Sequence, residues 1–230
     1  MIQLTDVAKI YGKKQNQFAA LEGVNLSIES GKSVAIIGKS GSGKSTLMHV
    51  ISGLDRATSG TITIDGQDIS QLKNKALDKF RSEKIGFIFQ SFFVQANETC
   101  LQNVLLPLEI SRVPRSERKR RAMEALESVE LGEKAASKAK NLSGGQKQRL
   151  AIARAIVSKP GIIFADEPTG NLDSTTGETI ENLLFSLNKK LGCTLIIVTH
   201  DKDLAEKCDV QINLKDGNIV KATGSGRSKK

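Results

Sequence analysis

A glycine-rich stretch constrains the fold of this chain more than any other part of the sequence. Residues 38–45 read Gly-Lys-Ser-Gly-Ser-Gly-Lys-Ser, which matches the pattern G-x-x-x-x-G-K-[ST] in full. Residues 33–37, just before it, form a short apolar run typical of a strand buried on both faces. Residues 44–51 have the pattern of a helix, with Gly53 as a stop signal. We therefore predict a strand, a phosphate-binding loop and a helix in succession.

The residue types in this loop suit the binding of a nucleoside triphosphate. Glycines let backbone N–H groups curl around phosphate oxygens, and the helix N-terminus adds the positive end of its dipole. Lys44 is placed to neutralise the β and γ phosphates, and the Ser45 hydroxyl is placed to ligate Mg²⁺. The flanking strand and helix disfavour the alternative, a glycine-rich turn that matches the pattern by chance.

Two adjacent acids follow the apolar run 162–165. At the carboxyl end of a parallel strand, side chains point into the ligand crevice. Asp166 suits the shell of Mg²⁺, which takes few carboxylates together with water and phosphate oxygens. Glu167 is placed to polarise an attacking water. His200 follows another apolar run, 195–198; a single histidine is more often structural, but this one is predicted to reach the same crevice and the γ-phosphate.

The order of patterns along the chain predicts an α/β fold. Apolar runs at 162–165 and 194–198 flank a helical stretch near 175–191, which indicates a strand–helix–strand crossover and a parallel sheet. Residues 61–64 look like one arm of an antiparallel hairpin, and 91–157 carry helical patterns without a convincing strand. We expect a parallel-sheet core of the P-loop NTPase (RecA-like) type, an antiparallel β subdomain and an inserted α-helical subdomain. The expected divisions are 1–90 for the β subdomain and the first part of the core, 91–157 for the helical subdomain, 158–221 for the rest of the core, and 222–230 for a flexible tail.

Composition excludes several classes of protein. A hydrophobic fraction of 39% and a charged fraction of 26% fit a globular chain and not a disordered one. No stretch approaches the roughly 18 apolar residues of a membrane-spanning helix, and the first six residues lack the layout of a signal peptide. Cys100, Cys193 and Cys208 are odd in number and lack metal-ligand spacing, which predicts buried or inert thiols. These features exclude a disulfide scaffold, an integral membrane protein and a zinc module.

The net charge of +9 is concentrated in part in the segment 112–121, which holds six basic residues. Such a segment could lie near anionic lipid headgroups. The alternative is a solvated helix face, which the interspersed Glu117 and Glu124 favour. Aromatic residues make up only 4% of the chain, so there are few stacking platforms for single-stranded nucleic acid.

A second glycine-rich helix start occurs at 142–146, Leu-Ser-Gly-Gly-Gln, ahead of a helical pattern at 147–157. With a serine hydroxyl and two glycines, it too can bind an anion, although one nucleotide does not need two such sites in one chain. At this point the sequence resembles the nucleotide-binding subunit of ABC transporters, whose LSGGQ signature has this form. The resemblance extends from Ile2 to about Val220, with the motifs in the family's order.

The resemblance implies nucleotide contacts in the first part of the chain. Tyr11 matches the aromatic residue that stacks on adenine. The Walker A loop supplies the phosphate contacts, and its residues are Gly38, Ser40, Gly41, Ser42, Gly43, Lys44, Ser45 and Thr46.

The resemblance implies catalytic and metal roles further along the chain. Gln90, after a strand at 85–89, matches the Q-loop glutamine that touches Mg²⁺ and links to the membrane partner. Asp166 and Glu167 match the Walker B aspartate and the catalytic carboxylate, and His200 matches the switch histidine. By this resemblance Ser45, Gln90 and Asp166 would ligate Mg²⁺.

The family also implies a head-to-tail dimer, which accounts for the second anion site. Ser143, Gly144 and Gly145 of one chain, followed by Gln146, would close over the ATP held by the other. Residues 171–173 match the D-loop, in which Asp173 would also contribute to the nucleotide site.

Within the family, several segments resemble the lipoprotein-releasing and macrolide-exporter subgroup. These segments are residues 40–48, 53–55, 86–90, 103–108 and 166–173. Related cassettes of peptide-resistance and cell-division systems share much of this pattern. The chain departs from the subgroup at 91–100, which usually holds a proline and leucine-rich stretch facing the membrane subunit, and at Ala139, where proline is frequent.

The resemblance implies an ATPase on the cytoplasmic face of the plasma membrane that binds ATP and Mg²⁺. Its expected partners are a separate transmembrane permease and a second copy of itself, with no nucleic acid. The expected cargo is a peptide, lipoprotein or drug-like molecule that is exported or extracted. One alternative is a signalling module of the cell-division type that transports nothing. Another, suggested by the positive charge, is a nucleic-acid-associated ABC ATPase, although such proteins resemble tandem cassettes or carry long insertions.

Overall fold

The computed structural model describes residues 1–13 and 16–224 of the chain. The chain divides into two compact units. Unit 1 comprises Met1–Asp78 and Thr194–Lys230, and unit 2 comprises Lys79–Cys193. Unit 2 is therefore one continuous segment inserted into the sequence of unit 1.

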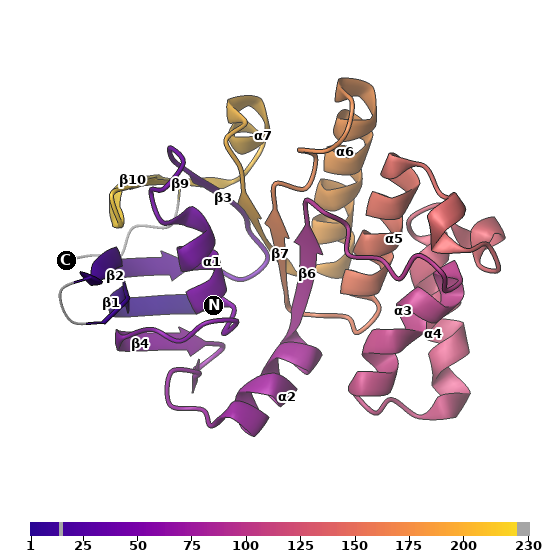
Figure 1. The fold of residues 1–230 in the computed structure, drawn as a ribbon, viewed down its shortest axis with the longest axis horizontal. Coiled ribbons are helices and arrows are strands. Elements are labelled where there is room, and N and C mark those ends of the chain that lie inside the picture. The colour runs from indigo at the N-terminus through magenta and orange to yellow at the C-terminus, as the bar shows by residue number, and fades with distance from the viewer. Residues whose placement is uncertain (14–15, 225–230) are drawn as a thin grey trace. The chain divides into compact units, whose positions relative to one another are not determined.

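One sheet of unit 1 is antiparallel, with the strand order β2-β1-β4-β5 (Figure 1). Its strands are β1 (Ile2–Tyr11), β2 (Phe18–Ile28), β4 (Ser59–Ile64) and β5 (Gln67–Asp68). The turn between β4 and β5, Asp65-Gly66, has φ values of 49° and 82°. A two-residue hairpin turn of the favoured twist needs positive φ at both positions. The hairpin arm predicted at 61–64 is confirmed as the end of β4.

Four further strands of unit 1 lie in the order β10-β9-β3-β8. They are β3 (Ser33–Ile37), β8 (Thr194–Val198), β9 (Val210–Lys215) and β10 (Asn218–Thr223), accompanied by the helices α1 (Lys44–Ile51) and α7 (Lys202–Glu206). Strand β3 pairs in parallel with both β8 and β9. All five residues of β8 are buried, as continuous apolar strands of a parallel sheet should be.

Strand β10 extends into the segment 222–230 that was expected to be a flexible tail. Ala222 and Thr223 pair with Ile212 and Gln211 of β9. The expectation is wrong for these two residues, because pairing with β9 is a long-range interaction that local composition does not reveal. Residues 225–230 of the expected tail lie outside the described residues.

Unit 2 places helices around two parallel strands, β6 (Ile85–Phe89) and β7 (Ile162–Asp166) (Figure 1). Its helices are α3 (Cys100–Ile110), α4 (Arg115–Glu127), α5 (Gly144–Ile156) and α6 (Ser174–Leu191), with 3₁₀ turns at Gly132–Lys134 and Ala139–Asn141. Helix α2 (Asn74–Lys84) leads into β6 across the unit boundary. Thr99 begins α3 with a capping box, which satisfies N–H groups that a helix start leaves unpaired. The helical patterns predicted within 91–157 correspond to α3, α4 and α5.

The basic segment forms much of α4 and is extensively paired. Arg120 forms an ion pair with Glu124 at 2.5 Å, and Arg121 pairs with Glu117 at 3.5 Å. Arg118 pairs with Glu109 of α3 at 3.6 Å. These i,i+4 and interhelix pairs are what the solvated-helix-face interpretation predicts.

Cys100, Cys193 and Cys208 are buried and form no disulfide bond with one another, and burial raises the pKa of the Cys100 and Cys193 thiols, which makes these thiols less reactive. Within residues 1–13 and 16–224, no helix has both the length and the apolar character needed to cross a bilayer.

Candidate nucleotide-binding site

The phosphate loop of unit 1 joins β3 to α1. Helix α1 begins after Gly43, whose φ is 100°, and no side chain caps its first turn. The first N–H groups and the positive end of the helix dipole are therefore left for an anion. The Lys44 ammonium donates hydrogen bonds to the carbonyls of Gly38 (2.9 Å) and Lys39 (3.1 Å). The loop thus presents a cation and a helix N-terminus together.

Two glycines of the loop are required by close backbone contacts. A Cβ atom at Gly38 would lie 2.3 Å from the carbonyl oxygen of Leu214 in β9. A Cβ atom at Gly43 would lie 2.5 Å from the carbonyl oxygen of Ala20 in β2. Because both obstacles are backbone atoms, no side chain fits at either position. The loop therefore lies in close backbone contact with β9 and β2.

Ser42 provides a test of whether the loop fits a phosphate ligand. The residue is 4% exposed, and its hydroxyl is a buried polar atom without a hydrogen-bond partner among the described residues. Its backbone carbonyl, in contrast, accepts a hydrogen bond from the N–H of Gly217 (3.1 Å). A buried hydroxyl without a partner costs about 1–3 kcal/mol, and because protein atoms cover this oxygen, a phosphate bound outside the loop does not reach it. The uncapped start of α1 and the Lys44 ammonium are therefore the features of the loop that fit the expected ligand.

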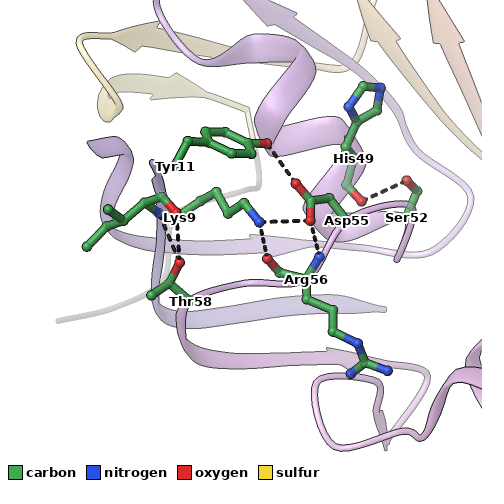
Figure 2. A network of polar contacts seen from close by, with 8 residues as sticks. Lys9, Tyr11, His49, Ser52, Asp55, Arg56 and Thr58 are labelled. Carbon is green, nitrogen blue, oxygen red and sulfur yellow. Dashed lines mark hydrogen bonds and ion pairs between the residues drawn. The ribbon is translucent and has the colours of Figure 1, made fainter. Parts of the chain in front are cut away.

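Tyr11 ends β1 and is held by polar contacts in unit 1 (Figure 2). Its hydroxyl donates a hydrogen bond to Asp55 Oδ2 (2.8 Å) and also contacts the side chain of Thr46 on α1. Burial and the hydrogen bond to Asp55 raise the pKa of Tyr11. The structure therefore brings the predicted adenine-stacking residue together with the helix that carries the phosphate loop.

His200 lies at the same end of the β3–β8 pair as the start of the phosphate loop. Ile36 and Val198 are partners in the parallel register, and Gly38 and His200 each follow two residues later. The N–H of Thr199 donates to the carbonyl of Ile36 (3.2 Å), which extends the pairing towards His200. The register therefore places His200 at the edge of the sheet where the phosphate loop of unit 1 begins.

In unit 2, Gln90 and the acid pair occupy the carboxyl end of the β6–β7 pair. Phe89 and Asp166 are register partners, so Gln90 and Glu167 follow at the same edge of the sheet. Glu167 has a φ of 44°, a left-handed conformation that costs a non-glycine residue roughly 1–2 kcal/mol. Such strain is characteristic of functional sites, where the surrounding structure maintains it.

Gln90 is also tied to the segment predicted as the D-loop. Its side-chain nitrogen donates to Asn171 Oδ1 (3.2 Å), and Asn171 Nδ2 donates to the backbone carbonyl of Gln90 (2.9 Å). A Cβ atom at Gly170 would lie 2.7 Å from the same glutamine nitrogen. Gly170 therefore lets the two loops approach closely.

The signature loop and the D-loop meet at the starts of α5 and α6. Ser143 caps α5, and the side-chain oxygen of Gln146 accepts a hydrogen bond from the N–H of Ser143, which completes a capping box. Asp173 caps α6 by accepting from the N–H of Thr176 (3.0 Å), and hydrogen bonds from Thr176 lower the pKa of Asp173. A Cβ atom at Gly145 would lie 2.5 Å from Thr176 Cγ2, so glycine is needed where the two helix starts approach.

Comparison with known proteins identifies the family. Residues 21–170 match the ABC transporter family. The chain is 47% identical over 220 residues to the ABC transporter ATP-binding protein YvrO of Bacillus subtilis, covering 96% of each chain. The chain belongs to the ABC transporter family. It is an ATP-binding cassette and an ATPase, and the predicted P-loop α/β fold class is confirmed.

Relatives of this cassette include proteins named for release and export. It is 45% identical over 220 residues to the lipoprotein-releasing system ATP-binding protein LolD of Syntrophotalea carbinolica, covering 96% of this chain and 97% of that protein. It is 44% identical to the macrolide export ATP-binding/permease protein MacB of Aggregatibacter actinomycetemcomitans, covering 97% of this chain and 34% of that longer protein. The predicted subgroup is confirmed.

A solved cassette matches nearly the whole chain. This is the dimeric post-hydrolysis state of an ATP-binding cassette bound to ADP and Pi, with a TM-score of 0.87 and 43% identity. The match covers 97% of this chain and 98% of that chain. The similarity therefore includes both units of the cassette.

Two polar residues of α5 that the sequence analysis did not single out support loops of the ABC cassette. Gln148 is fully buried, and its side-chain nitrogen donates to the carbonyl of Pro168 (2.6 Å), the residue after Glu167. The Arg154 guanidinium donates to the carbonyls of Phe93 (2.5 Å) and Phe92 (3.0 Å). Both residues interrupt the apolar helical pattern of 145–157, and this interruption was the sequence signal that could have revealed their supporting roles.

Arg154 supports a strained part of the loop that follows Gln90. Phe92 and Phe93 have φ values of 53° and 48°, and two consecutive left-handed aromatic residues are unfavourable. Their carbonyls both accept from the guanidinium, and the ring of Phe93 packs edge-on against Phe89 at 5.4 Å. This strained turn lies in the segment 91–100, where the sequence departs from its subgroup.

Arg154→Ala is expected to lower the free energy of unfolding of the cassette by about 2–3 kcal/mol, because charged hydrogen bonds to two carbonyls are lost. Urea unfolding monitored by circular dichroism measures the change. Arg120→Ala is the matched control, since Arg120 forms an exposed helix pair worth at most about 1 kcal/mol. Equal effects of the two substitutions would contradict the supporting role of Arg154.

Proposed function

We propose that this cassette drives a separate transmembrane permease from the cytoplasmic face of the plasma membrane. The proposed cargo is a peptide, lipoprotein or drug-like molecule that is exported or extracted. The observation that carries the proposal is the similarity over nearly the whole chain to LolD, named for lipoprotein release, and to the ATP-binding part of MacB, named for macrolide export. These relatives favour transport over a signalling role of the cell-division type.

The nucleotide roles proposed for unit 1 follow from its local geometry. The loop Gly38–Thr46 would hold the phosphates through its N–H groups, and Lys44 would neutralise their charge. Tyr11 would stack on adenine, and His200 would contact the γ-phosphate.

Mg²⁺ is proposed to be held by Ser45, Gln90 and Asp166. Hydroxyl, amide and carboxylate oxygens are the donors that Mg²⁺ prefers. A single carboxylate among these ligands suits an ion that is held jointly with substrate phosphates. When bound, the ion would neutralise charge on those phosphates.

Glu167 is proposed to act as the general base, accepting a proton from the attacking water. Its left-handed backbone and the support of Pro168 by Gln148 fit a carboxylate that is held in one orientation. A fixed orientation matters, because a base acts only within hydrogen-bond reach of the proton it removes.

A second copy of the chain is proposed to complete each nucleotide site. Ser143, Gly144 and Gly145 at the start of α5, with Gln146 and Asp173 beside them, would close over ATP bound to the partner copy. The dimeric state of the similar solved cassette supports this arrangement. Closure on ATP would be a population shift whose size is set by differential binding to the dimer.

Hydrolysis would reopen the dimer, and the motion would pass to the permease through residues 90–100. Affinity capture of Glu167→Gln from detergent-solubilised native membranes with ATP, followed by mass spectrometry, tests this proposal. A permease in the eluate is the expected result. A partner with few spans and a large extracytoplasmic domain supports the exporter-like mechanism.

Controls make the capture experiment decisive. Capture without ATP separates nucleotide-dependent partners from background. Adding Ser143→Arg to Glu167→Gln places a large cation at the proposed closure surface, so ATP-dependent capture should fall while the Walker A loop is untouched. Recovery of soluble partners alone would contradict the membrane assignment.

A further inference from the structure

The ion pair between Lys9 and Asp55 lies against Tyr11 and has no role in the function proposed above. The Lys9 ammonium is 2.7 Å from Asp55 Oδ1 and 2.8 Å from the carbonyl oxygen of Arg56. The other carboxylate oxygen, Asp55 Oδ2, accepts the hydroxyl of Tyr11 at 2.8 Å. Figure 2 shows that one carboxylate holds both the ammonium and the phenol.

The same ammonium also covers one face of the tyrosine ring. Lys9 Nζ lies 4.6 Å from the centroid of the Tyr11 ring, a cation–π distance. Lys9 is only 9% exposed, and a buried lysine needs such compensation for the water it has lost. Because the cation occupies one face, only the opposite face of the ring is available to a base.

This arrangement connects the ring to the helix that begins at the phosphate loop. Lys9 and Tyr11 are two residues apart on β1, so their side chains project from the same side of the strand. Asp55 follows the end of α1, and its N–H donates to the carbonyl of His49 within that helix (3.0 Å). The separation between the ring and the phosphate loop is thus set by one short rigid helix.

The negative charge of Asp55 stabilises its contacts with Lys9 and Tyr11. Partial burial alone would raise the pKa of Asp55, but hydrogen bonds from Lys9, Tyr11 and the Arg56 backbone outweigh it and lower that pKa. Asp55 therefore stays ionised at neutral pH and keeps both partners in place.

We propose that Lys9 and Asp55 are positioning residues that hold Tyr11 as a one-sided stacking platform at a set distance from the phosphate loop. The ligand is a purine nucleoside triphosphate, and the inference rests on the proposed role of Tyr11. A ring that is already ordered loses less rotamer freedom when the base binds, so the affinity for the nucleotide rises.

The composition of the chain makes this inference directly testable. The sequence has one Tyr and no Trp, so its intrinsic fluorescence reports Tyr11 alone. ATP is expected to change this fluorescence as the base stacks, whereas inorganic tripolyphosphate, which has no base, is expected to leave it nearly unchanged. Calorimetry gives the affinity for each ligand, and free N-acetyltyrosinamide corrects for light absorbed by ATP.

Lys9→Met is expected to weaken ATP binding about two- to tenfold, because a ring that is not ordered beforehand loses rotamer freedom when the base stacks on it. Tripolyphosphate affinity is expected to stay near the wild-type value, and Lys9→Arg is expected to restore most of the ATP affinity. Lys79→Met, which removes the same group from an exposed i,i+4 pair with Glu83, is the matched control. Thermal unfolding shows that each variant is folded.

Asp55→Ala provides a second readout that a purely structural role would not change. The charged groups that face the phenol are Asp55 and Lys9, and removing the carboxylate is expected to lower the pKa of Tyr11, measured by tyrosinate absorbance. Wild-type ATP affinity in Lys9→Met and Asp55→Ala, with a loss in Tyr11→Leu, would overturn the inference and leave the stacking role intact. Undiminished ATP affinity in Tyr11→Leu would instead refute the stacking role itself.

Discussion

Glu167→Gln is expected to lower kcat for ATP hydrolysis by about 10²- to 10⁴-fold, the usual contribution of a positioned general base. The amide matches the carboxylate in shape and places the same demand on the left-handed backbone at this position. It does not accept a proton from water, so the chemistry is lost while the fold remains. ATP affinity is expected to stay near the wild-type value. Phosphate release and calorimetry measure the two quantities.

The same variant should accumulate the ATP-bound dimer. Light scattering is expected to show a doubled mass with ATP and the monomer mass without it. Glu133→Gln, in the exposed 3₁₀ turn Gly132–Lys134, makes the same change of charge and is expected to hydrolyse ATP normally. Undiminished turnover in Glu167→Gln would remove Glu167 from its proposed role.

Lys44→Ala is expected to weaken ATP binding by at least about tenfold, because a hydrogen bond to a charged group contributes about 1.5–3 kcal/mol. Tripolyphosphate affinity should fall in parallel, since Lys44 is proposed to act on the phosphates and not on the base. Among the described residues, its ammonium donates hydrogen bonds to two loop carbonyls at a partly exposed position. Water can replace bonds at such a position, so the free energy of unfolding is expected to fall by less than in Arg154→Ala. Calorimetry and urea unfolding separate the two effects.

Lys39→Ala is the matched control for Lys44→Ala. Lys39 is an exposed lysine of the same loop, and the pattern G-x-x-x-x-G-K-[ST] does not specify its position. Removal of its charge is expected to reduce ATP affinity only slightly, because it lowers the positive electrostatic potential near the loop without removing a specific contact. If Lys39→Ala and Lys44→Ala weakened ATP binding equally, net charge and not a specific contact would explain the effect.

The strands that the sequence predicted best are those of the parallel sheet. Residues 33–37 and 194–198 match β3 and β8, because strands buried on both faces are continuously apolar. Helix α2 and strands β9 and β10 were not predicted. Helix α2 is strongly polar, and β10 depends on pairing with β9, so local patterns carried little signal for them.

Some parts of the candidate site could likewise be predicted from the sequence and others could not. The phosphate loop, the signature loop and the acid pair each occupy one short stretch of sequence, and their chemistry depends on local backbone conformation and a helix start. A short motif is enough to identify such features. The hydrogen bonds that support those loops are different, because they join residues distant in sequence, as Gln148 joins Pro168 beside the acid pair across 20 positions.

Local sequence patterns were therefore sufficient to identify the family and the fold class, and they predicted which residues would contact the nucleotide. Only the tertiary structure decided how those residues are held: Gly43 against Ala20, Glu167 in a left-handed conformation, and Tyr11 between Lys9 and Asp55. The physical reason is that motifs are local, whereas burial, close backbone contacts and shared hydrogen-bond acceptors arise only once distant segments pack together.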